Sequence, residues 1–306
     1  MGGRIGVTVT PWGTRGSLPA PGPESRRYGG NTSCVEVRCD SGALLVLDAG
    51  TGIRRLGAAL KSGSPCENGL ANRIDILLTH LHMDHIQGLG FFTPLYDSEM
   101  EIHIWGPAST ARPLRQRLSR YLSPPLFPVH LRSLPSRILL HDVPREDLTV
   151  GNFHVTSAFV CHPGATVGFR IESPDGVIAY LPDHEPALGV ADFPGDPNWT
   201  SGYSLAHGAD ILIHDAQYTA KEYASHVGWG HSSIDQVLAF AEMSGAKHVV
   251  LFHHDPVRED LELEQILAEA LAKRDGSAVT VSVAAEERSY RLEKGRLTVG
   301  PVPTVA

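Results

Sequence analysis

Residues 79–88, with the sequence THLHMDHIQG, constrain the fold of this chain more than any other segment. They place three histidines and an aspartate within six positions, directly after RIDILL, a largely apolar run that is typical of a buried strand. Burying four ionisable side chains without a partner would cost several kcal/mol. The fold must therefore bring these groups around something that offsets this cost, and a metal ion suits their chemistry.

The spacing within the segment directs its side chains at two neighbouring points. His80 and His82 are two residues apart, so both point to one side of an extended strand end. Asp84 and His85 come after the chain has turned and can aim at a second point nearby. Neutral imidazoles suit a borderline metal such as zinc, and the carboxylate adds negative charge. The segment therefore predicts a metal site at the end of a strand.

Further ligands must come from elsewhere, and three apolar runs end in a residue that can bind a metal. His162 follows TSAFVC, Asp183 follows GVIAYLP and His253 follows KHVVLF, as expected of a site along one edge of a sheet. Cys161 and His254 would point the opposite way in an extended chain, so we favour His162 and His253. Most of the 16 histidines need no such role. Those expected at the surface or in ordinary core positions are His103, His130, His141, His154, His207 and His248.

Predicted strands and helices alternate along all 306 residues, which is typical of an α/β protein. There is no internal repeat and no linker long enough to divide the chain, so we expect one domain over residues 1–306. Residues 109–122, STARPLRQRLSRYL, are expected to be helical, with Pro113 near the first turn. Residues 232–246, SSIDQVLAFAEMSGA, predict a helix that begins at serines and ends at Gly245.

Composition and charge argue against several classes of protein. No stretch approaches the roughly 20 apolar residues of a membrane span, and the N-terminus lacks the apolar region of a signal peptide. We therefore expect a cytoplasmic protein with no membrane partner. The cysteines form no C-x-x-C pair, which argues against a zinc finger or a disulfide framework and indicates buried small side chains. They are Cys34, Cys39, Cys66 and Cys161.

The formal net charge is −8, and no block of lysine and arginine is present. Arginines do gather between Arg112 and Arg137, but proline and leucine interrupt them. A long nucleic acid is therefore not expected as a partner, because neutralisation of phosphates supplies most of that affinity. A small anionic substrate held at one local site remains compatible with this charge.

The motif THLHMDH, followed in order by His162, Asp183 and His253, resembles the metallo-β-lactamase fold hydrolases. The resemblance runs from about residue 12 to residue 255 and implies a four-layer αβ/βα sandwich with a two-metal site. It assigns His80, His82 and His162 to one metal. It assigns Asp84, His85 and His253 to the other. Asp183 would bridge the two ions. The favoured metal is Zn²⁺, with Mn²⁺ or Fe as the alternatives.

Two further motifs are similar to those of the ribonuclease Z branch of this family. WGHSS, residues 229–233, looks like the G-H-S motif of the branch, and ILIHDAQY resembles its strand that ends in HE or HD. By this resemblance His231 would be a general acid that protonates the leaving oxygen, and Asp215 would orient it. The alternative is that His231 only neighbours a helix cap or supports a metal ligand.

The chain also departs from the ribonucleases that process transfer RNA. Their tRNA-gripping arm lies between the segments that match His162 and Asp183, and here one tight hairpin spans the 21 positions between them. The opening WGTRGSLPAPGPESRRYGGNTSCVEV resembles small phosphodiesterase-like members, in which residues 28–33 would lie near the active site; a plain turn is equally compatible. Asp48 ends another strand, where it would hold a histidine ligand or the glycine loop, or else cap a helix.

The resulting hypothesis is a dinuclear-metal phosphodiesterase that hydrolyses a small anionic phosphodiester, most of all a cyclic nucleotide, by attack of a metal-bound hydroxide. Its catalytic residues would be Asp84, His231 and Asp215. The alternatives are hydrolysis of a carboxyl ester, thioester or lactone at the same site, and a sensor that binds a nucleotide or metal without turnover. We also expect that the chain could form a homodimer, with residues 121–131, YLSPPLFPVHL, as a contact or lid segment.

Overall fold

The computed structural model describes residues 6–62, 72–145, 148–187, 189–190, 192–272 and 276–303. Within these ranges Cys34 and Cys39 are buried, as expected, and Cys161 is half-buried. Cys66 lies outside the described residues.

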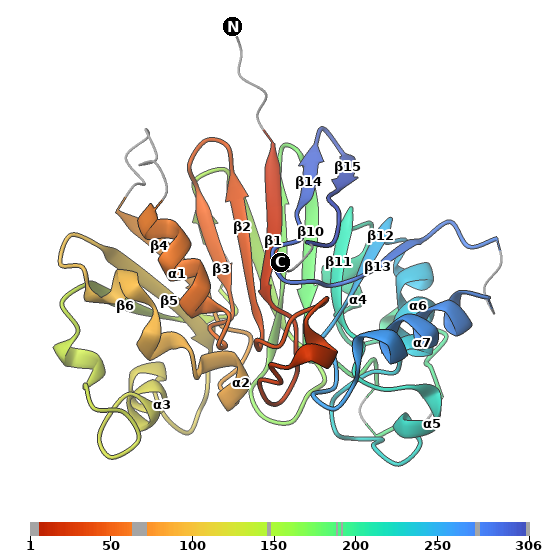
Figure 1. Ribbon diagram of the computed structural model, residues 1–306, viewed down its shortest axis with the longest axis horizontal. Helices are drawn as coiled ribbons and strands as arrows, with labels where there is room; N and C mark the ends of the chain where they lie inside the picture. Colours follow the sequence, from red (N-terminus) through yellow and green to blue (C-terminus); the bar gives the residue numbers. More distant parts are fainter. Residues whose placement is uncertain are drawn as a thin grey trace, which may run out of the picture.

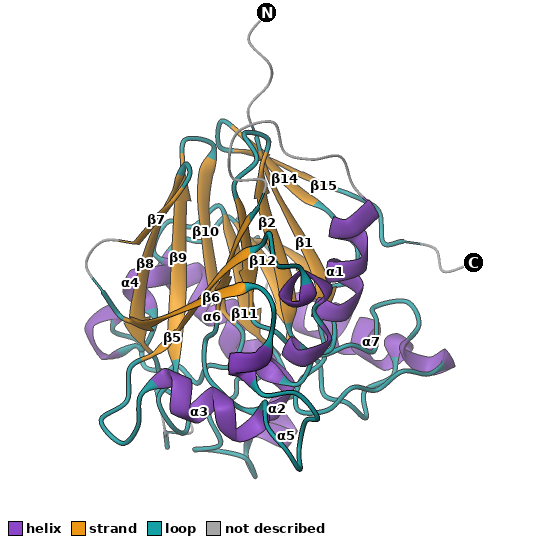
Figure 2. Ribbon diagram, turned by 90° about the vertical axis from the view of Figure 1, so that its left-hand side faces the viewer, coloured by secondary structure: helices purple, strands orange, loops and turns teal. Residues whose placement is uncertain are grey.

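Two β-sheets carry most of the fold (Figures 1 and 2). The described part of the first sheet has the strand order β15-β14-β1-β2-β3-β4-β5-β6, and that of the second has the order β13-β12-β11-β10-β9-β8-β7. The strands of the first sheet are β1 (Val7–Gly13), β2 (Cys34–Cys39), β3 (Leu44–Leu47), β4 (Arg73–Leu77), β5 (Glu101–Pro107), β6 (Arg137–Val143), β14 (Tyr290–Glu293) and β15 (Arg296–Val299). Those of the second are β7 (Leu148–Val150), β8 (Phe153–Phe159), β9 (Val167–Ser173), β10 (Gly176–Leu181), β11 (Ile211–Asp215), β12 (His248–Phe252) and β13 (Thr280–Val283).

Helices connect these strands. The α-helices are α1 (Ile53–Ser62), α2 (Met83–Ile86), α3 (Leu114–Tyr121), α4 (Tyr203–Ala206), α5 (Ala220–Tyr223), α6 (Ile234–Ser244) and α7 (Asp260–Ala272). Short 3-10 turns are η1 (Pro23–Ser25), η2 (Leu89–Phe91), η3 (Thr93–Tyr96), η4 (Leu131–Ser133) and η5 (Pro197–Trp199). Among the described residues, no helix combines the length and the apolar character that crossing a membrane requires.

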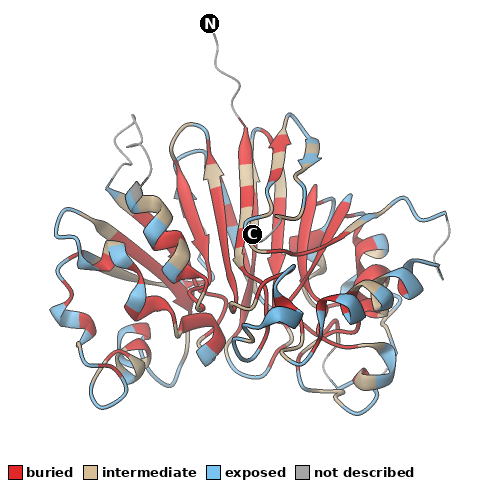
Figure 3. Cartoon of the chain, in the orientation of Figure 1, coloured by how far each residue is buried: buried red, intermediate tan, exposed pale blue. Residues whose placement is uncertain are grey.

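Three apolar cores define the layers of the molecule. One core fills the space between the sheets and includes the fully buried Tyr180. A second packs α1 and α3 on the outer face of the first sheet, through residues such as Leu56 and Leu118. A third packs α4 and α6 on the outer face of the second sheet, through Leu205 and Phe240. Figure 3 shows buried strands between helices whose outer sides are exposed. The chain is therefore the four-layer αβ/βα sandwich that its resemblance implies.

The central strands read as continuous apolar runs because both faces of each sheet are covered. Strands β3, β4 and β5 run parallel to one another, as do β10, β11 and β12. All five residues of β11 and of β12 are buried. Because parallel strands end at the same edge of a sheet, the residues that follow them gather along the lower edge in Figure 1. The predicted ligands lie on this edge.

Helix ends follow the local sequence, with one correction. Helix α6 starts after Ser233, which forms a capping box with Gln236, and it ends at Gly245 in the left-handed conformation, as predicted. The expected helix over residues 109–122 is wrong at its start, since α3 begins only after Pro113. Proline disfavours helical geometry in the residue before it, so residues 109–112 stay non-helical.

Strands β9 and β10 form a tight hairpin in which Ser173 pairs with Gly176. This hairpin spans much of the chain between His162 and Asp183. The expectation that no long arm fits between these two residues is therefore confirmed.

Arg15 connects the loop after β1 to the segment after β12. Its side chain is fully buried, and its Nε donates to the carbonyl of Gly29 at 2.8 Å. Its Nη1 donates to the carbonyls of Arg258 at 2.7 Å and Asp255 at 3.2 Å. Nη2 contacts the carboxylate of Asp260 at 3.3 Å. The planar guanidinium therefore satisfies several buried acceptors at once.

Replacing Arg15 by lysine should lower the free energy of unfolding by about 3 kcal/mol, because one ammonium cannot reach all of these acceptors. Urea denaturation measures the loss. Arg27→Lys is the control, since the side chain of Arg27 is 54% exposed, forms an ion pair with Glu264 and lies over the ring of Tyr28, contacts that a lysine can also make. Equal losses in the two variants would contradict this account.

Candidate metal centre

Two groups of side chains meet at the edge where the parallel strands end. Within each group, one ligand atom per residue lies within 4.8 Å of the others. The first group is His80, His82 and His162. The second group is Asp84, His85, Asp183 and His253. The structure therefore brings together every residue that the sequence nominated as a ligand, although these residues come from four separate segments.

Asp183, which follows β10, lies between the two groups and is almost completely buried. Its Oδ1 is 2.9 Å from Nε2 of His85 and 3.3 Å from Nε2 of His253. Its Oδ2 is 3.7 Å from Nε2 of His80 and 3.8 Å from Nε2 of His162. Each carboxylate oxygen thus faces a different group of histidines.

Three of the histidines are fixed by contacts of their Nδ1 atoms with oxygen acceptors. These contacts are His85 to Asp48 Oδ2 at 2.8 Å, His162 to the carbonyl of Gly230 at 2.8 Å, and His253 to Gln217 Oε1 at 3.1 Å. Because each partner accepts, Nδ1 carries a proton, and Nε2 is the ring nitrogen that faces the cluster and can bind a metal. Such partners orient the histidines of metal sites.

The cluster requires positive charge. Nε2 of His80 is buried without a hydrogen-bond partner in the described structure, and Nε2 of His85 and Oδ1 of Asp183 approach to 2.9 Å without the geometry of a hydrogen bond. Burial lowers the pKa of His162 to about 4 and holds that of His80 well below its ordinary value. Burial also disfavours charge on His85, but the carboxylates of Asp183 and Asp84 outweigh it and raise its pKa. Lone pairs and carboxylates that converge in this way fit divalent cations.

Asp84 completes the second group and is held from the N-terminal loop. Its Oδ2 lies 3.2 Å from Nε2 of both His85 and His253, and it accepts a hydrogen bond from the backbone N–H of Ser17 at 2.8 Å. At Gly16 an added Cβ would lie 2.3 Å from Nδ1 of His253, so the loop can approach the imidazole only because this residue is glycine. His253 itself has a φ of 59°, a conformation that non-glycine residues seldom adopt.

Asp48, at the end of β3, supports the cluster from behind. Besides His85, its carboxylate accepts hydrogen bonds from the backbone N–H of Thr79 at 2.8 Å and the hydroxyl of Tyr180 at 2.9 Å. The expectation that Asp48 holds a histidine is confirmed. The alternative, a helix cap, is wrong, because these three residues take up its oxygens.

His231 stands beside both groups and is oriented by Asp215. Its Nδ1 lies 2.6 Å from Oδ2 of the fully buried Asp215. Its ring stacks on that of His253 with centroids 4.9 Å apart and meets His162 edge-on at 5.0 Å. Burial lowers the pKa of His231, but the charge and hydrogen bond of Asp215 outweigh it and raise the pKa to about 9. The contact with Asp215 therefore favours the protonated form of His231.

The sequence left open the roles of His254 and of the loop over residues 28–33. His254 contacts the carbonyl of Ala284 at 3.1 Å, and burial lowers its pKa to about 3. In the 28–33 loop, the Asn31 amide donates to Glu286, and the Thr32 hydroxyl accepts from the backbone N–H of Thr51. These polar atoms are used within the protein, which favours a structural turn there.

Glu185 is a residue that our sequence reasoning missed. It is fully buried, and its Oε1 accepts from the hydroxyl of Tyr223 at 2.5 Å and the N–H of Gly228 at 2.9 Å. Its Oε2 accepts from the N–H of Gly230 at 2.9 Å. Glu185 thereby fixes the turn that precedes His231 and supplies the carbonyl that holds His162. The available signal was a second carboxylate two positions after Asp183, directly behind a buried strand.

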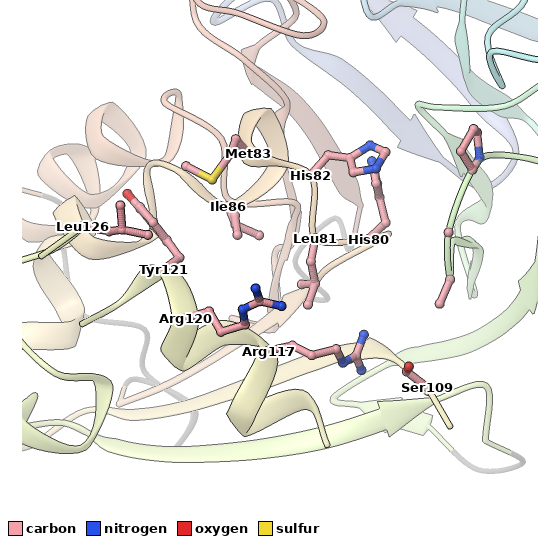
Figure 4. A pocket seen from close by; sticks show the side chains of 13 residues that line it. His80, Leu81, His82, Met83, Ile86, Ser109, Arg117, Arg120, Tyr121 and Leu126 are labelled. Atoms are coloured by element: carbon pink, nitrogen blue, oxygen red, sulfur yellow. The ribbon is translucent and has the colours of Figure 1, made fainter. Parts of the chain in front are cut away.

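A cavity of about 430 Å³ opens beside the first group (Figure 4). Its wall includes His80 and His82, with Arg117, Arg120 and Tyr121 contributed by α3. A small ligand that enters this cavity would therefore reach the edge of the metal cluster.

Comparison with known proteins gives consistent results. Residues 44–254 match the family model described as Beta-lactamase superfamily domain. A ribonuclease Z from Mycobacterium sp. (strain KMS) is 29% identical over 264 residues, which cover 78% of this chain and 81% of that protein.

Solved structures share the fold at lower identity. The metallo-beta-lactamase fold protein YhfI from Bacillus subtilis gives a TM-score of 0.65 at 17% identity, covering 94% of this chain and 99% of its own. The short form of human tRNase Z gives a TM-score of 0.62 at 23% identity, covering 97% of this chain and 100% of its own. At these identities the likeness concerns the fold alone.

Replacing Glu185 by glutamine should lower the free energy of unfolding by about 2 kcal/mol, because the new NH₂ group would face an N–H or O–H donor. Backbone amides of residues 228–232 should then exchange faster in hydrogen–deuterium exchange. Glu172→Gln on β9, where the side chain is 42% exposed, should leave that exchange unchanged. Unaltered exchange in the Glu185 variant would contradict this account.

Proposed function

Because this chain belongs to the Beta-lactamase superfamily, we propose that it is a dinuclear-metal phosphodiesterase that hydrolyses a small phosphodiester, with a cyclic nucleotide as the favoured substrate. The chain is a metal-dependent hydrolase, in keeping with its family and its ribonuclease relatives. One observation carries the proposal: Asp183 faces both groups of histidines with different oxygens, next to a histidine that Asp215 orients.

The proposed ligand sets follow the two groups. His80, His82 and His162 would hold one ion, Asp84, His85 and His253 would hold the other, and Asp183 would contribute to both. When bound, two divalent ions supply an activated water and neutralise charge that develops on the phosphoryl group. The nitrogen and oxygen donors suit Zn²⁺, with Mn²⁺ or Fe as alternatives.

The residues of the chain itself then orient the reaction. His231 donates a proton to the departing oxygen, and Asp215 keeps its ring in place through the 2.6 Å contact to Nδ1. Asp84 is proposed to be a catalytic residue as well as a metal ligand. The N–H of Ser17 fixes the direction of its carboxylate. Proton donation matters for an alkoxide leaving group, which is a poor one unless it is protonated.

The substrate is proposed to be small. Several relatives are named ribonuclease Z, which supports phosphodiester chemistry. The tight β9–β10 hairpin and the net charge of −8 argue against a bound transfer RNA precursor. A cavity of about 430 Å³ matches the range typical of small-molecule sites.

Two other functions use the same residues. A carboxyl ester, thioester or lactone hydrolase would need the same metals. It would depend less on the proton donor His231 and on Asp215, which orients it. A sensor without turnover would retain the ligands yet need no oriented proton donor. Homodimer formation stays a prediction.

Metal-loaded protein should release product from 3′,5′-cyclic nucleotides and from a generic aryl phosphodiester, as measured by chromatography. Asp183→Ala should abolish turnover, because both ions lose the ligand that they share. Asp97→Ala, on an exposed turn, is the control and should behave like the unaltered protein. If neither substrate were cleaved, the ester hydrolase and sensor functions would take precedence. If only the aryl diester were cleaved, the phosphodiesterase function would stand and the proposal of a cyclic nucleotide as substrate would be wrong.

His231→Ala should lower kcat by about 10²- to 10⁴-fold on a diester with an alkoxide leaving group. The loss should be far smaller with 4-nitrophenolate, which departs without protonation. Metal content, measured by plasma mass spectrometry, should stay normal, and the exposed His207→Ala should affect neither quantity. A variant that loses its metal would mean that His231 is a ligand.

A further inference from the structure

The cavity beside the first histidine group carries two arginines, although the chain as a whole is acidic. Figure 4 shows Arg117 and Arg120 reaching from α3 into the same opening as His80 and His82. None of the described residues that line this opening is acidic. It is therefore a locally positive site next to the proposed reaction centre.

The two arginines differ in how they are held. Arg117 is largely buried, and its guanidinium donates to the carbonyls of Pro107 and Arg112, with Asp142 at 4.0 Å. Arg120 is exposed and has no ion pair or side-chain hydrogen bond within the described ranges. Arg117 thus provides a fixed charge, whereas Arg120 has its donors available for a ligand.

Apart from the two histidines and Ser109, the rest of the described lining consists of apolar residues, a glycine and the ring of Tyr121. Leu81, Ile86 and Leu126 surround the opening together with the ring of Tyr121. The Tyr121 hydroxyl donates to the carbonyl of Gln87 at 2.5 Å, which holds the ring in place. Leu126 is 69% exposed, so a ligand could cover it. An apolar wall with adjacent guanidinium groups suits a ligand that has both a flat body and an anionic group.

The position of the cavity decides which part of a substrate it would receive. Its described lining includes His80 and His82 but neither His231 nor Asp215. Because the leaving oxygen must lie at His231 to be protonated, the leaving group departs from another side of the cluster. The cavity would therefore bind the substituent that stays attached to phosphorus after the leaving group departs.

We propose that this cavity binds the retained part of the substrate as a nucleoside that carries a second phosphate, with Arg120 and Arg117 on the phosphate and the apolar wall on the nucleoside. This inference rests on the proposed phosphodiesterase function and narrows its substrate class. A simple cyclic nucleotide has no second phosphate, so it would contact the apolar wall but not the two arginines. Paired guanidinium groups favour phosphodiesters with a further phosphate, because charge-assisted hydrogen bonds to phosphate are the strong ones.

A matched pair of substrates tests the second phosphate directly. They are thymidine 5′-(4-nitrophenyl phosphate) and the same compound with a 3′-phosphate. In both, water attacks phosphorus, the bond to the nitrophenyl oxygen breaks, and 4-nitrophenolate leaves with the electron pair. The products are thymidine 5′-monophosphate and thymidine 3′,5′-bisphosphate. A third substrate, with a 3′-linked second nucleoside, distinguishes an oligonucleotide end from a free nucleotide.

The unaltered protein should cleave the 3′-phosphorylated substrate with a kcat/KM about tenfold higher than its partner. Arg120→Gln should remove this preference, mainly by lowering kcat/KM on the 3′-phosphorylated substrate. Arg115→Gln is the control, since Arg115 is exposed on the same helix but does not line the cavity. A higher kcat/KM on the third substrate, also lost in Arg120→Gln, would support the inference and assign the second phosphate to an oligonucleotide.

Calorimetric titration separates binding from turnover. Thymidine 3′,5′-bisphosphate should bind about tenfold more tightly than thymidine 5′-monophosphate, and Arg120→Gln should abolish the difference. If both substrates are cleaved and Arg120→Gln changes neither ratio, the inference is overturned and the phosphodiesterase stands. If neither is cleaved but the binding preference depends on Arg120, the cavity stands and the phosphodiesterase function fails.

Discussion

The buried convergence of lone pairs and carboxylates around Asp183 is the constraint on which the rest of the site depends. Histidine rings whose Nδ1 atoms contact oxygens of Asp48, Gly230 and Gln217 turn their Nε2 atoms toward one another and toward carboxylate oxygens. Without cations such an arrangement is repulsive, and the raised pKa of His85 expresses the same demand for positive charge. The sandwich fold meets this demand by ending its parallel strands at a common edge, where ions can reach all of these atoms.

The supporting contacts explain why the site extends beyond its ligands. Glu185 lies two positions after Asp183 in the chain, and it holds the turn that precedes His231. The Gly230 carbonyl of the same turn fixes the ring of His162. The end of β10 therefore positions Asp183, one histidine of the first group and the proposed proton donor. This coupling links the geometry of the proposed acid to that of the metal ligands.

Part of this site could be predicted from sequence, and the physical reason is local. His80, His82, Asp84 and His85 lie within one short segment, and His162, Asp183 and His253 each end an apolar run, so alternation and strand ends suffice to find them. The four-layer fold followed from resemblance to a family. Glu185 was missed because its partners lie in a distant turn, 38 to 45 positions along the chain. The role of Arg120 depends on how α3 packs, which no local pattern reveals.

The two groups of side chains are proposed to hold two divalent ions that share Asp183. Metal analysis of the purified, metal-loaded protein, combined with anomalous diffraction from its crystals, tests this most directly. The account predicts two ions per chain, one at each group, both in contact with the carboxylate of Asp183. A single ion, or a second ion bound away from Asp84, His85 and His253, would contradict it.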